Sequence, residues 1–188
     1  AAVNMKPVLH EKYSRTKGDF APLMPKVAQS NAQAVIWVGS GAHVADGVKA
    51  LRATGSKAQV VTLSNNASSG FIKALGEHAR GVLVTQVFPF ERSMASPMVK
   101  ELLEMLAARR KGEEATPAML EGFAAAKVLV EALRRAGRDP TPERIKNALE
   151  SFKRVDIGGL EITYSPTDHT GLDYADLSII SAAGRFQR

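Results

Sequence analysis

The sequence predicts a three-layer α/β fold, in which a parallel sheet is flanked by helices. Short apolar runs of strand length recur at residues 34–38, 59–63 and 81–88. Between the first two runs lies a stretch with helical periodicity, and between the next two lie a polar loop and a short helix start. Strands that alternate with helices at such spacings are typical of right-handed βα units and a parallel sheet.

The stretch from Gln33 to Gly55 is the clearest of these units. Its apolar run, Ala-Val-Ile-Trp-Val, is β-branched and aromatic, and we expect a strand buried on both faces. A glycine turn follows, and apolar residues then recur at helical spacing until Gly55 closes the helix. Ligands of open α/β sheets bind at the carboxyl ends of the strands. Ser40 and Gly41 are therefore the first candidate binding residues.

The rest of the chain is richer in helices. We expect helices at residues 20–28, 98–110, 118–136 and 142–152, with Asp19 as N-cap of the first and Thr141 as N-cap of the last. The helix at 118–136 carries an apolar stripe formed by Met119, Phe123, Ala126, Val130 and Leu133. Residues 160–164 and 175–180 alternate like strands around a loop at 165–171, and a turn follows at 182–185.

Composition narrows the function classes. Hydrophobic residues make up 45% of the chain, which allows a sizeable core, and the absence of cysteine excludes disulfides and thiolate sites. The formal charge of +6 raises the question whether the chain binds nucleic acid. The densest basic groups, at 109–111 and 134–135, lie at helix ends, where cations complement the helix dipole. No aromatic residues interleave with them as a stacking surface requires, so we expect no nucleic-acid partner.

A second polar cluster follows the strand at 59–63. Adjacent parallel strands bring their carboxyl ends to one sheet edge, so Ser64, Asn65 and Asn66 are expected beside Ser40 and Gly41. His43 stands close enough to the glycine turn to touch a ligand. Phe88 and Phe90 flank Pro89 at the end of the third strand and would wall an apolar pocket. Each group also has a structural interpretation. Ser40 and Gly41 would form a tight turn, and Ser64, Asn65 and Asn66 a turn and helix cap. His43 would be a solvated side chain, and Phe88 and Phe90 would pack in the core.

No catalytic, metal or cofactor site is expected. The glycine turn lacks the third glycine of a dinucleotide-binding fingerprint, because Val44 stands in its place. It also lacks the spacing of a nucleophile elbow, and the four histidines fall in separate segments without ligand spacing. No segment is apolar enough to span a membrane, and residues 1–13 lack the apolar core of a signal peptide. The protein is therefore either cytoplasmic, or any such signal lies upstream of this sequence.

Five stretches together resemble the substrate-binding proteins of branched-chain amino-acid ABC transporters, the leucine/isoleucine/valine-binding family. They are KGDFAPLMPKV, AVIWVGSGAHVADGVKALRATG, GVLVTQVFPF, EGFAAAKVLVEALRRAG and HTGLDYADLSIISAAGRF. The resemblance implies a periplasmic receptor of type I fold, with two lobes that close over a small-molecule ligand and dock on a membrane permease. A complete member is roughly twice this length, so the two-lobe architecture is incomplete here. Periplasmic localisation is implied, with no signal peptide in this chain.

The resemblance also implies a division of the chain. Residues 1–93 would form most of the second ligand-binding lobe, and the helices at 94–153 would pack on the missing first lobe. Residues 154–188 would be hinge-crossing strands and the C-terminal tail. Apolar surface left by the missing lobe makes a homodimer an expected form of the isolated chain.

Carried over from the family, the ligand loops fall on Ser40 and Gly41 and on Ser64, beside Asn65 and Asn66. Ser40 and Gly41 replace an aromatic residue that is common in amino-acid-binding members, and Ser64 replaces the carboxylate that meets the ligand's ammonium group. A buried ammonium without a counter-charge is costly. We therefore expect an acid or amide rather than an aliphatic α-amino acid, unless the missing lobe supplies a carboxylate. An aromatic acid would pack against Phe88 and Phe90.

Two other functions are open on this sheet. A ligand-sensing regulatory domain would need a fused signalling or DNA-binding segment, and an enzyme would need a convergent acid, base or nucleophile. The sequence shows neither. An interaction module that uses the basic charge is a third alternative, and salt-dependent binding to DNA would identify it.

Overall fold

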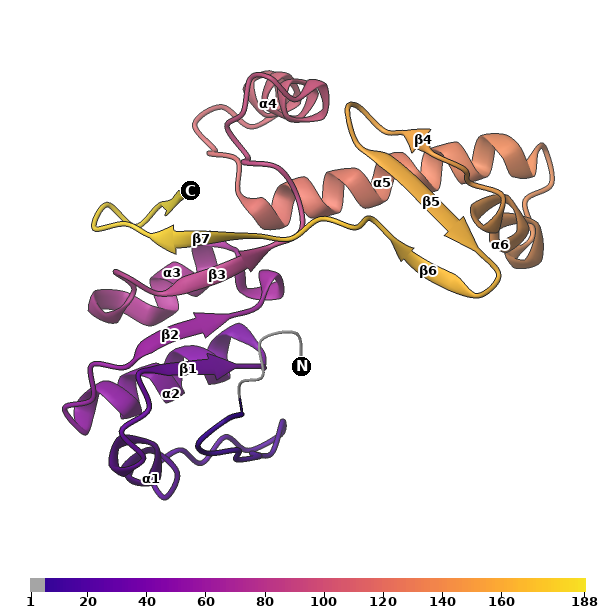
Figure 1. The fold of residues 1–188 in the computed structure, drawn as a ribbon. Helices are drawn as coiled ribbons and strands as arrows, with labels where there is room; N and C mark the ends of the chain where they lie inside the picture. The colour runs from indigo at the N-terminus through magenta and orange to yellow at the C-terminus, as the bar shows by residue number, and fades with distance from the viewer. Residues whose placement is uncertain (1–5) are drawn as a thin grey trace. The chain divides into compact units, whose positions relative to one another are not determined.

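The structure is a computed structural model that describes residues 6–188. The chain forms two compact units (Figure 1). Unit 1 consists of the chain up to Thr85 together with Leu177–Arg188, and unit 2 consists of Gln86–Asp176. The chain thus passes from unit 1 to unit 2 and back again. The predicted α/β fold, with a parallel sheet flanked by helices, is confirmed.

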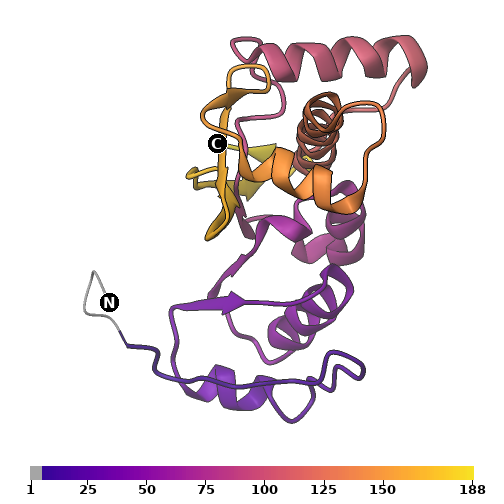
Figure 2. The ribbon, with the colours of Figure 1, turned by 90° about the vertical axis from the view of Figure 1, so that its right-hand side faces the viewer.

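Unit 1 is built on a five-stranded sheet in the order β1-β2-β3-β7-β8. The strands are β1 (Ala34–Trp37), β2 (Gln59–Thr62), β3 (Leu83–Gln86), β7 (Asp176–Ile180) and β8 (Phe186–Gln187). β1, β2 and β3 are parallel, and β8 runs antiparallel to β7. Its α-helices are α1 (Met24–Gln29), α2 (Gly41–Ala53) and α3 (Ser69–Leu75), with a short 3₁₀ turn at Gly76–His78. Figure 2 shows α2 and α3 on the same face of the sheet.

The core of unit 1 lies between this face and the helices. Val44, Val48 and Leu51 of α2 are fully buried against Val60 of β2 and Val84 of β3. Full burial of such a side chain stabilises a fold by about 1.5–3 kcal/mol relative to leaving it exposed. These α2 residues are the ones whose helical spacing predicted the helix.

Strand β1 differs from the prediction of a strand buried on both faces. Trp37 is buried under α2, whereas Ile36 is 73% exposed and Ala34 is also exposed. β1 is an edge strand, and the described helices cover only one side of it. The side chains on the other side of the strand, those of Ala34 and Ile36, therefore remain exposed to solvent.

Two boundaries in unit 1 also differ from the prediction. Helix α1 begins at Met24 with Leu23 at the cap position and no side-chain cap, so Asp19 is not its N-cap. The residues before it form a turn, and a proline occupies the first turn of the helix. Strand β3 ends at Gln86, two residues before Phe88, because the chain enters unit 2 there.

Unit 2 contains three helices and a three-stranded antiparallel sheet. The helices are α4 (Pro97–Arg109), α5 (Pro117–Ala136) and α6 (Pro142–Glu150). The strands are β4 (Val155–Asp156), β5 (Glu161–Ser165) and β6 (Asp168–Gly171). Ser96, Thr116 and Thr141 each accept a hydrogen bond at the start of a helix whose first turn holds a proline. The capping side chain and the proline after it together fix where each helix begins, and this start was predicted for the helix that Thr141 caps.

The segment predicted as a loop at 165–171 contains β6, so that prediction is wrong. Ser165 pairs with Asp168, and the Ser165 hydroxyl accepts a hydrogen bond of 3.0 Å from the Asp168 backbone N–H. The polar side chains thus close a tight turn between two strands. On α5, Leu120, Ala124 and Ala132 are buried, whereas the predicted stripe is only partly covered.

Candidate ligand-binding site

The first candidate loop joins β1 to α2. Ser40 occupies the N-cap position of α2 and is exposed, and its side chain makes no capping hydrogen bond. The first turn of α2 contains no acidic residue. Backbone N–H groups at the start of a helix carry a partial positive charge and attract anions. Gly41 opens the helix at this end, where the structure places it next to the second loop.

The second loop follows β2 and folds as a 3₁₀ turn, η1 (Ser64–Asn66). The Asn65 and Asn66 side-chain amides both donate to the Gly39 carbonyl, at 3.1 and 3.2 Å. Asn66 also donates to the Thr62 hydroxyl at 2.8 Å, and this hydroxyl donates to the Trp37 carbonyl at 3.0 Å. The structure therefore brings the two loops together at one sheet edge, as the sequence predicts.

These contacts separate the predicted residues by role. Asn66 is 2% exposed and its amide is used within the protein, so it holds the two loops together. Ser40 and Asn65 are exposed, and Ser64 is half-buried with its backbone N–H bonded to the Thr85 hydroxyl at 3.1 Å. Ser40 and Ser64 therefore offer hydroxyls to a ligand at this edge, and the exposed Asn65 amide also donates to the Gly39 carbonyl.

An aromatic cluster borders the first loop. The His43 ring lies edge-on to Tyr13, with centroids 6.0 Å apart, and 6.4 Å from the Phe20 ring. The Tyr13 hydroxyl donates to the Val38 carbonyl at 3.1 Å and occupies the position that a Cβ at Gly39 would take. The sequence pattern indicated His43 but not Tyr13. The one signal for Tyr13 in the sequence is that it is an isolated aromatic residue in a polar stretch.

Neither loop at this edge carries an acidic side chain. Residues 38–43 and 63–68 contain no aspartate or glutamate. The loops offer hydroxyls, an amide and helix N–H groups, which recognise a carboxylate better than an ammonium group.

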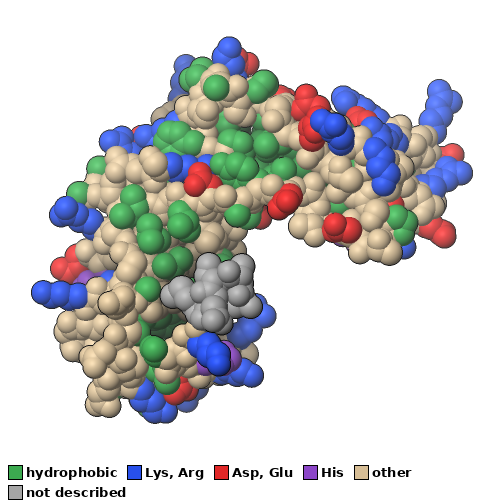
Figure 3. All heavy atoms as spheres, viewed as in Figure 1, with side chains coloured by type: hydrophobic (Ala, Val, Ile, Leu, Met, Phe, Trp, Pro, Cys, Tyr) green, Lys and Arg blue, Asp and Glu red, His purple; other side chains and the backbone are tan. Residues whose placement is uncertain are grey.

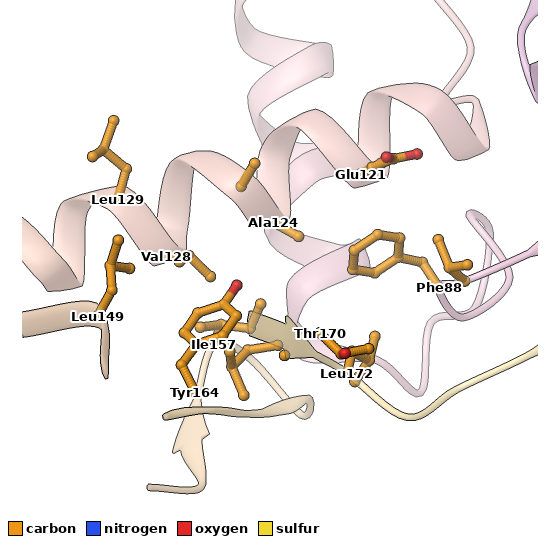
Figure 4. A pocket seen from close by; sticks show the side chains of 14 residues that line it. Phe88, Glu121, Ala124, Val128, Leu129, Leu149, Ile157, Tyr164, Thr170 and Leu172 are labelled. Carbon is orange, nitrogen blue, oxygen red and sulfur yellow. The ribbon is translucent and has the colours of Figure 1, made fainter. Parts of the chain in front are cut away.

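The two predicted wall residues, Phe88 and Phe90, belong to unit 2 and are half-buried. Phe88 lines an open apolar pocket of about 480 Å³ within that unit. Figure 4 shows this pocket between α5, which contributes Ala124 and Val128, and the strands that carry Tyr164 and Thr170. The pocket is formed by unit 2 alone. None of the predicted residues of unit 1 lines it.

Shifted pKa values occur away from these loops, in the turn and strands of unit 2. Backbone N–H bonds from Gly158 and Gly159 lower the pKa of Asp156, and a hydrogen bond from Thr170 lowers that of Asp168. No group of three or more potential metal ligands occurs among residues 6–188.

Across the same residues, no helix is both long and apolar enough to cross a lipid bilayer.

Comparison with known proteins gives a consistent result. A profile of the periplasmic binding protein family matches residues 1–182. A substrate-binding periplasmic protein from Ralstonia solanacearum is 29% identical with a TM-score of 0.79, over 93% of this chain and 50% of its own. An extracellular ligand-binding receptor from Verminephrobacter eiseniae is 26% identical with a TM-score of 0.76, over 90% of this chain and 48% of its own. No curated protein matches the sequence.

A possible leucine/isoleucine/valine-binding protein from Rhodopirellula baltica has the same fold, with a TM-score of 0.82 at 24% identity, over 94% of this chain and 48% of its own. The chain therefore spans about half the length of these solved structures. The family match covers nearly every residue, and the predicted resemblance is confirmed. The chain belongs to the periplasmic binding protein family.

Proposed function

We propose that this chain is part of a solute-binding receptor of an ABC importer, which binds a small carboxylate-bearing molecule and delivers it to a membrane permease. Membership of a solute-binding family supports a receptor rather than an enzyme or a regulatory domain. In this proposal the protein acts in the periplasm, and the full-length receptor holds the ligand between two lobes. Unit 1 corresponds to most of the second lobe, and the helices of unit 2 pack on the remainder of the first.

The observation that carries the proposal is the pair of loops at the carboxyl ends of β1 and β2, fastened by Asn65 and Asn66 to the Gly39 carbonyl. Ligands of α/β sheets bind at this edge. Two neighbouring loops held in a fixed relation form a preorganised half-site, which lowers the entropy cost of binding. Ser40 and Ser64 are its hydroxyl donors.

The ligand class follows from the chemistry of these loops. A carboxylate is satisfied by hydroxyls and helix N–H groups, whereas an α-ammonium group finds no carboxylate on either loop. We therefore propose an organic acid or amide as the ligand rather than an aliphatic α-amino acid.

Titration calorimetry on the full-length protein tests this proposal, with benzoate and L-leucine as probes. Benzoate is expected to bind, and L-leucine is expected to show no heat at millimolar concentration. Replacing Ser40 or Ser64 with alanine removes one hydrogen bond and lowers the affinity by about 10-fold. Ser69→Ala, an exposed serine at the start of α3, is the matched control and leaves the affinity unchanged. Micromolar binding of L-leucine would refute the proposed ligand class.

A further inference from the structure

The charge of this chain is divided unevenly between its two units. Unit 1 contains twelve lysine and arginine residues against four aspartate and glutamate residues, whereas unit 2 contains thirteen against fifteen. With histidine neutral, the formal charge is therefore +8 in unit 1 and −2 in unit 2. Figure 3 shows many Lys and Arg side chains and few acidic ones around unit 1. Unit 1 is thus the source of the chain's positive charge.

Three of these cations lie in one exposed turn of unit 1. We call residues 12–17 the basic turn, because this segment carries Lys12, Arg15 and Lys17, and all three are exposed. Within the described part of the chain, none of the three side chains forms an ion pair. Their charges are therefore not neutralised by a partner in the protein, and they act on ions in the surrounding solvent.

The four acidic residues of unit 1 leave most of this charge uncompensated. Glu11, which precedes the basic turn, is bonded to Lys26 at 3.4 Å. Glu77 belongs to the 3₁₀ turn after α3, and Asp46 is exposed on α2. Asp19, which follows the basic turn, is the acidic residue that reduces its charge. Since neither ligand loop contains an acidic residue, the potential around the first loop is positive.

The basic turn is fastened to the first ligand loop at both of its ends. Near its start, the Tyr13 hydroxyl donates to the Val38 carbonyl at 3.1 Å. After its end, Gly18 lies so close to two rings that a Cβ there would be 2.8 Å from Phe20 and 3.1 Å from His43. Val38 directly precedes the loop, and His43 belongs to the first turn of α2. The three cations are therefore held beside the start of α2.

The charge of the basic turn has the same sign as the partial charge at the start of α2. Ser40 makes no capping hydrogen bond there, so the helix N–H groups are open to an anion. These groups act only at close range, whereas full charges act over a Debye length, about 30 Å at 0.01 M salt and about 10 Å at 0.1 M. An anion is thus attracted by the cations first and is bound by the loop afterwards.

We propose that unit 1 concentrates organic anions at the loop after β1, and that Lys12, Arg15 and Lys17 supply this attraction. The biological role rests on the carboxylate-bearing ligand proposed above, but the attraction itself is measurable without that ligand. The three cations remain solvated and do not contact the bound anion. They therefore raise its association rate and leave its dissociation rate nearly unchanged, as charges at the rim of a site do.

Paramagnetic relaxation measured by NMR on the full-length protein tests the attraction directly. The probes are two nitroxides of similar size, the anion 3-carboxy-PROXYL and the cation 3-aminomethyl-PROXYL. At about 10 mM salt, the anion is expected to relax the Gly41 amide proton at least about 3-fold more than the cation does. The ratio should approach 1 at about 0.5 M salt, because the charges are then screened. A ratio near 1 at low salt would overturn the proposal.

Two triple variants assign the attraction to the basic turn. The test variant combines Lys12→Gln, Arg15→Gln and Lys17→Gln, and it is expected to lower the ratio at Gly41 by about 3-fold at low salt.

The matched control removes the same charge at the opposite edge of the sheet. There, one exposed lysine lies in the last turn of α3, and two further exposed cations precede β2 and β3. The control variant combines Lys73→Gln, Lys57→Gln and Arg80→Gln. It is expected to change the ratio at Gly41 much less. Equal losses from the two variants would assign the attraction to the overall charge of unit 1 and contradict the role of the basic turn.

Stopped-flow kinetics with benzoate separate this inference from the proposed function. In the full-length protein, the test variant is expected to lower the association rate by about 3-fold at about 10 mM salt and to leave the dissociation rate unchanged. A change in the dissociation rate alone would contradict the inference, because it would indicate direct contact with the ligand. If the anionic nitroxide is enriched at Gly41 but benzoate does not bind, the proposed ligand class fails and the inference stands.

Discussion

The Trp37 ring packs directly against Gly47 of α2. A Cβ at Gly47 would overlap the Trp37 ring, whereas a Cβ at Gly122 in α5 meets no atom within 4 Å. Both glycines lie inside helices, where glycine costs about 1 kcal/mol relative to alanine. The two positions therefore share the same backbone preference and differ only in the space available.

Substitution by alanine is predicted to have opposite signs at these two positions. Gly47→Ala displaces the indole and destabilises unit 1 by about 1–3 kcal/mol. Gly122→Ala is expected to stabilise unit 2 by up to about 1 kcal/mol. Denaturant unfolding followed by circular dichroism measures both, and Trp37, the single tryptophan of the chain, reports on unit 1 by fluorescence. A stabilising Gly47→Ala would contradict the packing of Trp37 described above.

Asn66 illustrates a residue whose role the sequence could not settle. Its position after a predicted strand suggested a ligand contact or a turn, and both interpretations fit the residue type. Only the fold shows that the amide is buried and bonded to Gly39 and Thr62. Contacts between residues more than twenty positions apart cannot be read from local pattern.

The neighbouring asparagines give the second prediction. Asn66→Ala removes the two hydrogen bonds that the buried amide donates to Gly39 and Thr62, which costs about 1–3 kcal/mol. Asn65→Ala, at an exposed position, is expected to change the stability by less than about 0.5 kcal/mol. Equilibrium unfolding in urea compares them. Equal losses from the two variants would show that the loops are not joined by a buried amide.

At the scale of elements, the strong periodic patterns predicted helices α2, α5 and α6, and the pattern at Thr141 predicted the start of α6. The side-chain caps and prolines at Thr116 and Thr141 are local signals, so the sequence contains them in full. Strand β6 was missed because its residues, Asp-His-Thr-Gly, are polar and exposed on both faces. A strand that buries nothing leaves no hydrophobic alternation to detect.

Burial of β1 was mispredicted for a related reason. An apolar run alone does not say which neighbours cover it, and the described helices pack on only one side. The same holds for α5, where Val130 and Leu133 of the predicted stripe are exposed. In both elements, residues 6–188 cover only some of the apolar side chains, and the others remain exposed.

The turn between β4 and β5 yields a pH prediction. Backbone N–H groups of Gly158 and Gly159 donate to the Asp156 carboxylate at 2.9 and 2.6 Å and lower its pKa. A carboxylate whose folded pKa is lowered contributes stability above its unfolded pKa, about 3.9, and loses it as the pH falls through the folded value.

Asp156→Ala is accordingly predicted to lower the Tm of unit 2 at pH 7. The difference from the wild type should be constant above about pH 5 and shrink below pH 4, where the wild-type carboxylate becomes protonated. Calorimetry across this pH range measures it, with the exposed Asp139→Ala as a control for loss of one charge. A difference that grows toward low pH would contradict the assigned sign.

At the scale of the whole molecule, the 188-residue chain exposes apolar surface on both of its units. Val38 and Ile179 are exposed in unit 1, and Leu129 and Val130 of α5 in unit 2. Contiguous apolar patches promote association. We predict that the isolated chain forms dimers or larger species in sedimentation velocity experiments. Ile36→Lys should reduce this association, and Ala53→Lys should not. A monomer at all concentrations would count against it.

Native mass spectrometry of the protein isolated from its source, without refolding, shows whether this chain is part of a larger receptor that binds a small molecule at the ends of β1 and β2. We expect a mass near twice the 20.1 kDa of this chain, with a small molecule bound that is released on denaturation. A mass near 20.1 kDa with nothing bound would contradict it.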